Sequence, residues 1–304
     1  MIYTVTFNPS VDCILHIGDV KFGGLNRASK EEFFFSGKGI NVSIVLKNLG
    51  LDSTAFGYVA GFTGDELIRR LNEFGVDSDF IKIGHGMTRI NLKLKSIDGT
   101  EINGSGPVIS PEDVEKLMEK LDKLGEGDVL FLAGSIPTVL PPTIYRDIMK
   151  RLQKREVMIV VDATKDLLVN VLEYHPFLIK PNNYELGEIF GVTLSTKEDV
   201  ILYAKKLQEM GAANVLVSMA GDGAVLVAED GSTYKSEAPE GKVKNSVGAG
   251  DSMVAGFLYG YLKSGIYEDA FYYGVCTGSA SAFSENLATR EEVDTLLRNI
   301  KNRA

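Results

Sequence analysis

The chain has 304 residues, of which 44% are hydrophobic and 24% are charged, values that exclude a disordered chain, a collagen, a coiled coil and a small disulfide-rich scaffold. Its 32 lysines and arginines against 41 aspartates and glutamates give a net charge of −9 and an isoelectric point near 5.0. This balance provides no chain-wide basic field for nucleic acid or an anionic membrane, so an anionic ligand would need locally concentrated positive charge.

The amino terminus and the cysteines predict a cytoplasmic protein. Residues 1–7 run directly into strand-like sequence and carry neither a basic region nor a signal-peptide cleavage site. Cys13 and Cys276 lie far apart and match no metal-ligand spacing, which indicates two reduced thiols that pack in the interior. The longest clean apolar runs, such as 157–161, have the length of a strand and are too short to span a bilayer.

Two segments, about 11–35 and 87–103, alternate apolar and polar positions without an intervening helix, as two-sided antiparallel strands do. They predict a small β layer inserted into a larger α/β body. In a monomer this layer would expose apolar residues such as Ile90, Leu92 and Leu94. We therefore expect it to pair with its copy in a homodimer.

From about residue 110 onward, short apolar runs alternate with helical patterns, which is typical of βαβ units and a parallel sheet buried on both faces. The clearest strands are 129–133, 157–161 and 214–218. Helices are expected at 111–123, 141–154, 196–211, 251–262, 267–283 and 289–300. Because ligands collect at the carboxyl ends of parallel strands, the residues that follow each apolar run are candidates for a site.

The first candidates for ligand binding are Asp12 and a glycine-rich turn. Asp12 follows a turn-rich break after the first strand, where it can hydrogen-bond sugar hydroxyls or act as a plain turn carboxylate. In segment 36–42, glycines such as Gly37 admit a close ligand, and Lys38 and Asn41 supply donors for a polyhydroxyl or phosphorylated molecule. The chain contains no P-loop and no dinucleotide fingerprint, and a tight turn with an exposed lysine explains the segment equally well.

Residues 88–95 alternate without a break, so Arg89, Asn91, Lys93 and Lys95 share one face of the expected strand. This face carries one arginine and two lysines with no acid between them, in a chain whose net charge is −9. It can hold a phosphate. The alternative is a solvated face, or an edge that lysines guard against aggregation.

Two further candidate segments, one with oxygen ligands and one with a glycine-containing turn, each follow a predicted strand. The segment Lys180–Glu185 begins a helix and places Asn182 and Glu185 one turn apart, where their oxygens suit Mg²⁺ or where Asn182 simply caps the helix. The segment Ser218–Gly223 follows a strand and lets an adenine or a phosphate lie against its backbone, unless it is an ordinary hairpin turn.

The strongest local signal is segment 245–257, where a small-residue turn opens directly into an apolar helix. Gly248, Ala249 and Gly250 have no large side chains, so an anion such as a phosphate can approach and bind the backbone N–H groups at the start of the helix. Asp251 is placed to accept the proton of an attacking hydroxyl. The alternative is a carboxylate that stabilises the amino end of the helix.

Together these motifs resemble the PfkB (ribokinase-like) carbohydrate kinases. The matching segments are Asn8–Asp12, Gly37–Asn41, Gly134–Pro137, Lys180–Glu185 and Val247–Asp251, and the resemblance extends over essentially the whole chain. Within the family, residues 88–93, 100–104 and 282–290 are most similar to bacterial kinases of fructose 1-phosphate, with kinases of tagatose 6-phosphate close behind.

The resemblance implies one domain over residues 1–304, with a three-layer α/β/α ribokinase-like fold, a mostly parallel central sheet and a small β-sheet lid. It implies transfer of a phosphoryl group from ATP, with Mg²⁺, to the C6 hydroxyl of fructose 1-phosphate, giving fructose 1,6-bisphosphate and ADP. The alternatives are a tagatose-6-phosphate kinase acting at the C1 hydroxyl and a sugar-phosphate-binding regulator without catalysis.

The resemblance also implies a role for each motif residue. Asp251 is the implied base, and its anion hole is formed by Gly248, Ala249 and Gly250. The implied sugar ligands are Asp12, Gly37, Lys38, Asn41 and Ser135, and the ligands of the sugar's phosphate are Arg89, Asn91 and Lys93, with Arg27 on the other lid segment as a further candidate. The implied nucleotide ligands are Lys180, Asn182, Ser218, Met219, Ala220, Gly221, Asp222 and Gly223, and those of Mg²⁺ are Asn182 and Glu185, directly or through water. Ser36 departs from the pattern, because the family commonly has glycine there.

Overall fold

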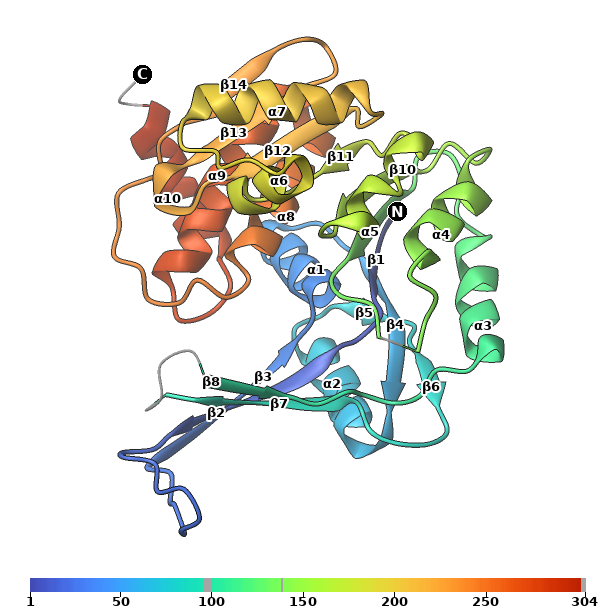
Figure 1. Cartoon of the computed structure of the whole chain (residues 1–304), viewed down its shortest axis with the longest axis vertical. Helices are drawn as coiled ribbons and strands as arrows, with labels where there is room; N and C mark the ends of the chain where they lie inside the picture. Colours follow the sequence, from blue (N-terminus) through green and yellow to red (C-terminus); the bar gives the residue numbers. More distant parts are fainter. Residues whose placement is uncertain (96–99, 138, 302–304) are drawn as a thin grey trace.

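A central sheet with helices on both faces forms the body of the molecule, and a second, smaller sheet projects from one side of it (Figure 1). The computed structural model describes residues 1–95, 100–137 and 139–301. The central sheet has the strand order β14-β13-β12-β11-β10-β9-β1-β4-β5, with β6 also paired to β4. Its strands are β1 (Ile2–Thr6), β4 (Thr54–Ala60), β5 (Asp77–Ser78), β6 (Ile81–Ile83), β9 (Val129–Ala133), β10 (Met158–Asp162), β11 (Leu178–Ile179), β12 (Asn214–Ser218), β13 (Ala224–Val227) and β14 (Thr233–Ser236).

The sheet is parallel from β6 to β12 and ends in an antiparallel edge formed by β13 and β14. Alternate residues of one strand belong to different cores: Leu130 and Leu132 of β9 pack on one side, and Phe131 packs on the other. Both faces of the sheet are therefore buried, which explains the continuous apolar runs in the sequence. The expected mostly parallel α/β/α body is confirmed.

Two helical layers cover the sheet. One contains α1 (Lys38–Leu49), α8 (Ala249–Ser264), α9 (Tyr267–Phe283) and α10 (Arg290–Lys301), with α2 (Gly61–Glu73) packed beside α1. The other contains α3 (Pro111–Leu121), α4 (Ile144–Leu152), α6 (Asn183–Phe190) and α7 (Lys197–Glu209), joined by the short α5 (Asp166–Val169). The predicted helices are all present, with ends that differ from the expected ones by no more than three residues.

The small sheet consists of β2 (Ser10–His16), β3 (Lys30–Ser36), β7 (Arg89–Leu94) and β8 (Thr100–Asn103), in the order β3-β2-β7-β8. It corresponds to the expected lid, of which residues 96–99 lie outside the described residues. The expectation of antiparallel strands is wrong for the central pair, because β2 and β7 run parallel. Both strands enter the small sheet from the body, β2 just after β1 and β7 just after β6, and so they point the same way (Figure 1).

The cysteines behave as expected. Cys13 and Cys276 are both buried and free. Within the described ranges, no helix combines the length and the apolar character needed to cross a bilayer.

Gly57 is a point where the sheet tolerates only glycine, and it sits beside the strand that leads to the small sheet. Its φ is +146°, and a Cβ there would lie 2.0 Å from the carbonyl oxygen of Thr6 in the neighbouring β1. We expect Gly57→Ala to lower the free energy of unfolding by about 2–5 kcal/mol, because backbone strain and overpacking add. Urea denaturation measures this, with Gly84→Ala as the control, since a Cβ at Gly84 meets nothing within 4 Å. A loss below about 1 kcal/mol would show that β1 and β4 separate easily.

Candidate active site

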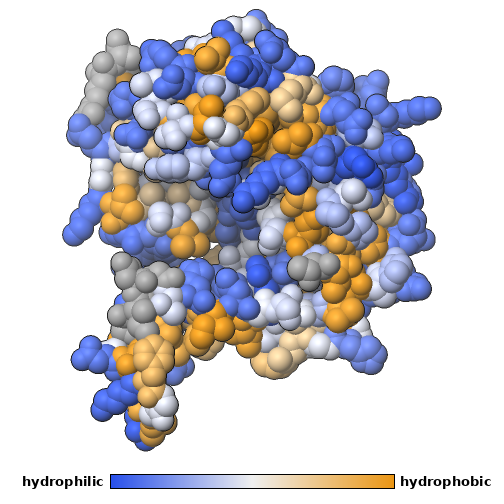
Figure 2. Space-filling view, viewed as in Figure 1, coloured by the Kyte–Doolittle hydropathy of each residue, from blue (hydrophilic) through white to orange (hydrophobic). Residues whose placement is uncertain are grey.

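A cavity of about 600 Å³ lies between the small sheet and the carboxyl ends of the central strands. The molecular surface is hollowed between these two parts (Figure 2). Most of the residues singled out in the sequence line this one cavity: Asp12, Gly37, Lys38, Asn41, Arg89, Asn91, Lys93, Ser135, Lys180, Glu185, Gly248, Gly250 and Asp251. Segments more than 200 residues apart in the chain thus meet in a single polar site.

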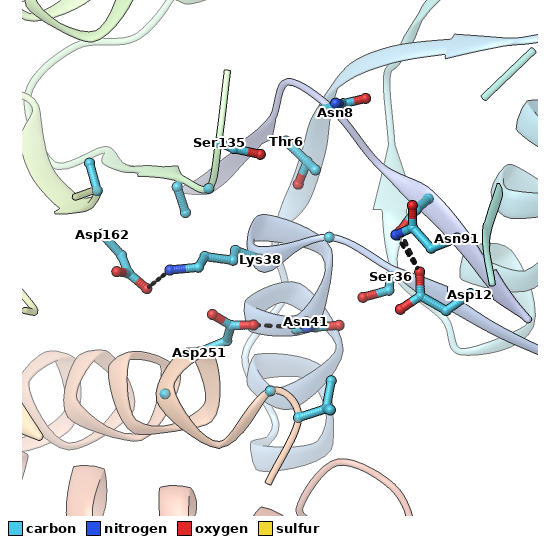
Figure 3. A pocket seen from close by; sticks show the side chains of 18 of the residues that line it. Thr6, Asn8, Asp12, Ser36, Lys38, Asn41, Asn91, Ser135, Asp162 and Asp251 are labelled. Atoms are coloured by element: carbon cyan, nitrogen blue, oxygen red, sulfur yellow. Dashed lines mark hydrogen bonds and ion pairs between the residues drawn. The ribbon is translucent and has the colours of Figure 1, made fainter. Parts of the chain in front are cut away.

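Asp251 lies in the first turn of α8, with 6% of its surface exposed. Its Oδ2 accepts a hydrogen bond of 2.8 Å from Asn41 Nδ2 on α1 (Figure 3). Burial and the nearby carboxylate of Asp162 raise the pKa of Asp251 to about 6, while Lys38, Asn41 and Lys180 act in the opposite direction. A carboxylate in this state is still ionised at neutral pH and is basic enough to accept a proton.

The amino end of α8 faces the same cavity. Gly248 precedes the helix with φ of +78°, a conformation that favours glycine, and a Cβ there would lie 2.8 Å from Leu287 Cδ2. Gly248 and Gly250 line the cavity, whereas Ala249 between them is not part of its lining. The backbone N–H of Ala249 donates to Ser246 O at 3.2 Å, so the helix dipole and the N–H groups of Gly248 and Gly250 are the features at this end that favour an anion.

Asp162, the last residue of β10, is fully buried and forms a charged cluster with two lysines. Lys38 Nζ donates to its Oδ2 at 3.1 Å, and Lys180 Nζ lies 3.6 Å from its Oδ1. Burial alone would lower the pKa of Lys38, but the charges of Asp162 and Asp251 raise it above its usual value. The sequence analysis did not single out Asp162, although it follows a clear apolar strand, which was the available signal.

The other end of the cavity is formed by the small sheet. Asp12 on β2 accepts a hydrogen bond of 2.9 Å from Asn91 Nδ2 (Figure 3). It also accepts one of 2.7 Å from Ser10 Oγ, and its Oδ2 lies 3.2 Å from Lys93 Nζ. Arg89 Nε donates to the carbonyl oxygen of Asn8, and burial lowers the pKa of Arg89. The predicted common face is confirmed for Arg89, Asn91 and Lys93, which line the cavity, whereas Lys95 lies beyond the end of β7, is exposed and is not part of the lining.

Ser36, the departure from the resemblance, is the last residue of β3 and also lines the cavity. Thr6, Asn8, Ser10 and Thr164 contribute further polar groups that the sequence analysis did not assign. Thr6 ends β1, Asn8 and Thr164 lie two residues beyond the ends of β1 and β10, and Ser10 begins β2.

Asn182 and Glu185 form a capping box at the start of α6. Asn182 Oδ1 accepts from Glu185 N, and Glu185 Oε2 accepts from Asn182 N, both at 2.8 Å. The helix-cap interpretation of Asn182 is therefore correct as a description of its contacts, while Glu185 also lines the cavity. Among the described residues, no group of three or more His, Cys, Asp or Glu side chains is arranged to hold a metal.

The segment Ser218–Gly223 lies outside the cavity lining, where it includes the last residue of β12 and the connection to the antiparallel β13. It is a hairpin connection with one turn of 3₁₀ helix at Ala220–Asp222. It remains next to the site, since Ser218 bridges to Asn182 and Ser218 N donates to Pro181 O. Arg27 lies exposed in the connection between β2 and β3 and is not part of the lining either.

The model of the pfkB family carbohydrate kinase matches residues 6–293 of the chain. A 1-phosphofructokinase from Bacillus subtilis is 49% identical over 301 residues, 99% of both chains, and a D-tagatose-1-phosphate kinase from Bacillus licheniformis is 34% identical over 97% of this chain and 96% of its own. The crystal structure of phosphofructokinase-2 from Escherichia coli in complex with fructose-6-phosphate is 26% identical, covers 99% of both chains and superimposes with a TM-score of 0.89.

The hydrogen bond from Asn41 predicts how activity depends on pH. A hydrogen bond to a charged group contributes roughly 1.5–3 kcal/mol, and one pKa unit corresponds to about 1.4 kcal/mol. Removing the donor in Asn41→Ala destabilises the charged carboxylate, so the pKa of Asp251 should rise by about one to two units from its value near 6. The acidic limb of kcat/KM for phosphoryl transfer should therefore move to higher pH.

The control for this measurement is Asn48→Ala on the same helix, where Asn48 Nδ2 donates to Ala288 O away from the cavity. The phosphate of a sugar phosphate also titrates near pH 6, but this contribution is common to all variants and cancels in the comparison. An unchanged limb in Asn41→Ala would show that Asp251 is not the group whose ionisation controls turnover.

Proposed function

The chain belongs to the pfkB family of carbohydrate kinases, and we propose that it transfers a phosphoryl group from ATP to the C6 hydroxyl of fructose 1-phosphate, giving fructose 1,6-bisphosphate and ADP. One observation carries the proposal. A single cavity has a basic carboxylate and a helix amino terminus at one end, Asp251 and Gly248 to Gly250, and the cations Arg89 and Lys93 at the other. A sugar with a phosphate on one end and a reacting hydroxyl on the other fits this polarity.

The reacting end supplies the chemistry of an in-line displacement. Asp251 accepts the proton of the attacking hydroxyl, and the backbone amides of Gly248 and Gly250 stabilise charge on the transferring group, whereas the amide of Ala249 is already bonded to Ser246 O. A near-neutral pKa suits this task, because the base is ionised at pH 7 yet binds the proton as the bond forms. Asp12, Gly37, Asn41 and Ser135 surround the space between the two ends and are proposed to hold the sugar.

The position of the phosphate decides which hydroxyl reacts. When Arg89, Asn91, Lys93 and the further candidate Arg27 hold a phosphate at C1, the C6 hydroxyl is presented to Asp251, whereas a 6-phosphate binds in the opposite sense with C1 inward. The names of the two curated relatives both place the substrate phosphate at C1. Fructose 1-phosphate is thus favoured over tagatose 6-phosphate. A regulator without catalysis is not favoured, since it needs no base of raised pKa.

The proposed nucleotide site adjoins the cavity at Lys180, Asn182 and the Ser218–Gly223 connection. Mg²⁺ takes few protein oxygens and completes its shell with water and phosphate oxygens. Asn182 Oδ1 and Glu185 Oε2 accept hydrogen bonds within the helix cap, and Glu185 also lines the cavity, so these residues fit a cation held largely through water. When bound, Mg²⁺ supplies charge that offsets the phosphates of ATP.

The substrate assignment predicts the outcome of a competition among fructose 1-phosphate, fructose 6-phosphate and tagatose 6-phosphate with ATP in excess. Fructose 1-phosphate should have the highest kcat/KM, because binding of its remote phosphate positions the C6 hydroxyl. Free fructose should be a very poor substrate, and Lys93→Ala should reduce discrimination between fructose 1-phosphate and fructose more than it weakens ATP binding. A preference for tagatose 6-phosphate would overturn the substrate but not the kinase, and efficient use of free fructose would refute the phosphate site.

We also propose a homodimer formed through the small sheet. Its face opposite to Asp12 and Asn91 is apolar and exposed: Phe33, Ile90 and Ile102 retain 56%, 41% and 59% of their surface. A second copy of this face would bury these side chains. Location in the cytoplasm stays a prediction from the sequence.

The dimer proposal predicts that Ile90→Glu gives a monomer, because a carboxylate would have to be buried in the interface. Light scattering at micromolar concentration measures the mass of the wild type and the variant. Leu202→Glu is the matched control, since Leu202 on α7 is also 55% exposed but lies on the body. A wild type that is monomeric and fully active would remove the proposal.

A further inference from the structure

We propose that Asp162 is a positioning residue for phosphoryl transfer: its buried carboxylate holds the ammonium of Lys38 in the cavity beside Asp251, where the transferred group passes. The inference deepens the proposed kinase function and rests on it. It assigns a role to a residue that the sequence motifs did not include.

Asp162 is a rigid anchor. It ends β10 in register with Ala133 of β9, its backbone oxygen accepts from Gly134 N, and its side chain is fully buried. A buried carboxylate is stable only when it is paired, and the partners here are Lys38 at 3.1 Å and Lys180 at 3.6 Å. The strand fixes the position of the carboxylate, and the carboxylate in turn fixes the lysines.

Lys38 is the flexible partner. It begins α1 at the glycine turn, and 37% of its side chain is exposed to the cavity. Figure 3 shows the side chain reaching across the cavity to Asp162, with Asp251 on the neighbouring helix. Of its three N–H groups, Asp162 is the acceptor for one, and no other hydrogen bond from this ammonium occurs within the described part of the chain. The remaining donors are available to a phosphoryl oxygen.

This arrangement lowers the cost of using a long side chain. An unrestrained lysine loses rotamer freedom each time it orders around a phosphoryl group. Asp162 orders Lys38 before the substrate arrives, so the charge is already in place when negative charge develops on the transferred group. Lys180, with 6% of its side chain exposed, is held by packing as well as by charge and needs the anchor less.

Asp162 also influences the base. The groups that act on Asp251 are Lys38 and Asn41 on α1, Asp162 at the end of β10 and Lys180 after β11. Asp162 opposes ionisation of Asp251, whereas the two lysines favour it. Replacing Asp162 by asparagine should therefore lower the pKa of Asp251, while replacing Lys38 by methionine should raise it. A residue that only stabilises the fold would produce neither shift.

The test is a double-mutant cycle with Asp162→Asn and Lys38→Met, assayed with the ketose phosphate that the wild type uses best. We expect Asp162→Asn to lower kcat by roughly 10–100-fold and to change KM for the sugar by less than about threefold. In the Lys38→Met background, Asp162→Asn should lower kcat by less than about threefold, because the lysine that Asp162 positions is absent. The acidic limb of kcat/KM should move down in Asp162→Asn and up in Lys38→Met.

Asp166→Asn is the matched control, since Asp166 is an exposed aspartate four residues along the chain. If Asp162→Asn does not fold, the cycle is replaced by Lys38→Met alone, which changes only the partly exposed partner and must show the loss of kcat and the upward limb. Additive losses in the cycle, or an unmoved limb, would overturn the inference.

The dependence of the rate on Mg²⁺ is a further test. If Asp162→Asn needs more Mg²⁺ for half-maximal rate and Lys38→Met does not, Asp162 acts on the metal and the inference is overturned. Failure of the proposed function gives a different result. A wild type inactive with every ketose phosphate refutes the function and this inference together, whereas an active wild type with additive variants refutes the inference alone.

Discussion

The pairing of charges at the carboxyl edge of the central sheet is the interaction on which the site depends. Asp162 and Asp251 are both almost fully buried, and each alone would be costly to ionise away from water. Lys38 and Lys180 offset this cost because they lie within reach of both carboxylates. The lysines do not fully cancel the effects of burial and of Asp162, so the pKa of Asp251 rises to about 6, a value that suits the base proposed for this site.

The small sheet completes the site by presenting two different faces. Alternation along β2 and β7 sends Asp12, Asn91 and Lys93 into the cavity and leaves Ile90 and Leu92 on the opposite face. A shift of one residue between these strands would exchange the faces and place apolar side chains in the cavity. The parallel register of β2 and β7, from Ser10 with Arg89 to Leu15 with Leu94, therefore determines which side chains line the cavity.

Periodicity made the fold predictable, and local motifs made most of the site predictable. Continuous apolar runs identified β9 and β12 because both faces of the sheet are buried, and glycine turns identified the loops around Gly37 and Gly248. Asp162 was not identified from the sequence, because its significance comes from its contact with Lys38, which is 124 residues away in the chain. The parallel pairing of β2 with β7 was not predicted for the same reason, since alternation in the sequence predicts a strand but not the strand beside it. The capping box of Asn182 and Glu185 shows how one local pattern fits two functions.

The two cations of the small sheet, Arg89 and Lys93, differ in how strongly each can attract a phosphate. Lys93 already lies 3.2 Å from Asp12 and 3.7 Å from Glu101, so a phosphate would share it with two carboxylates. Arg89 forms no ion pair with any side chain in the described part of the chain, donates only to a backbone carbonyl, and is half-buried at a cost that lowers its pKa. A dianionic phosphate relieves that cost, and the planar guanidinium still has its terminal N–H groups to offer. In the proposed phosphate site, Arg89 therefore contributes more attraction than Lys93, which binds the phosphate and also holds Asp12 in place.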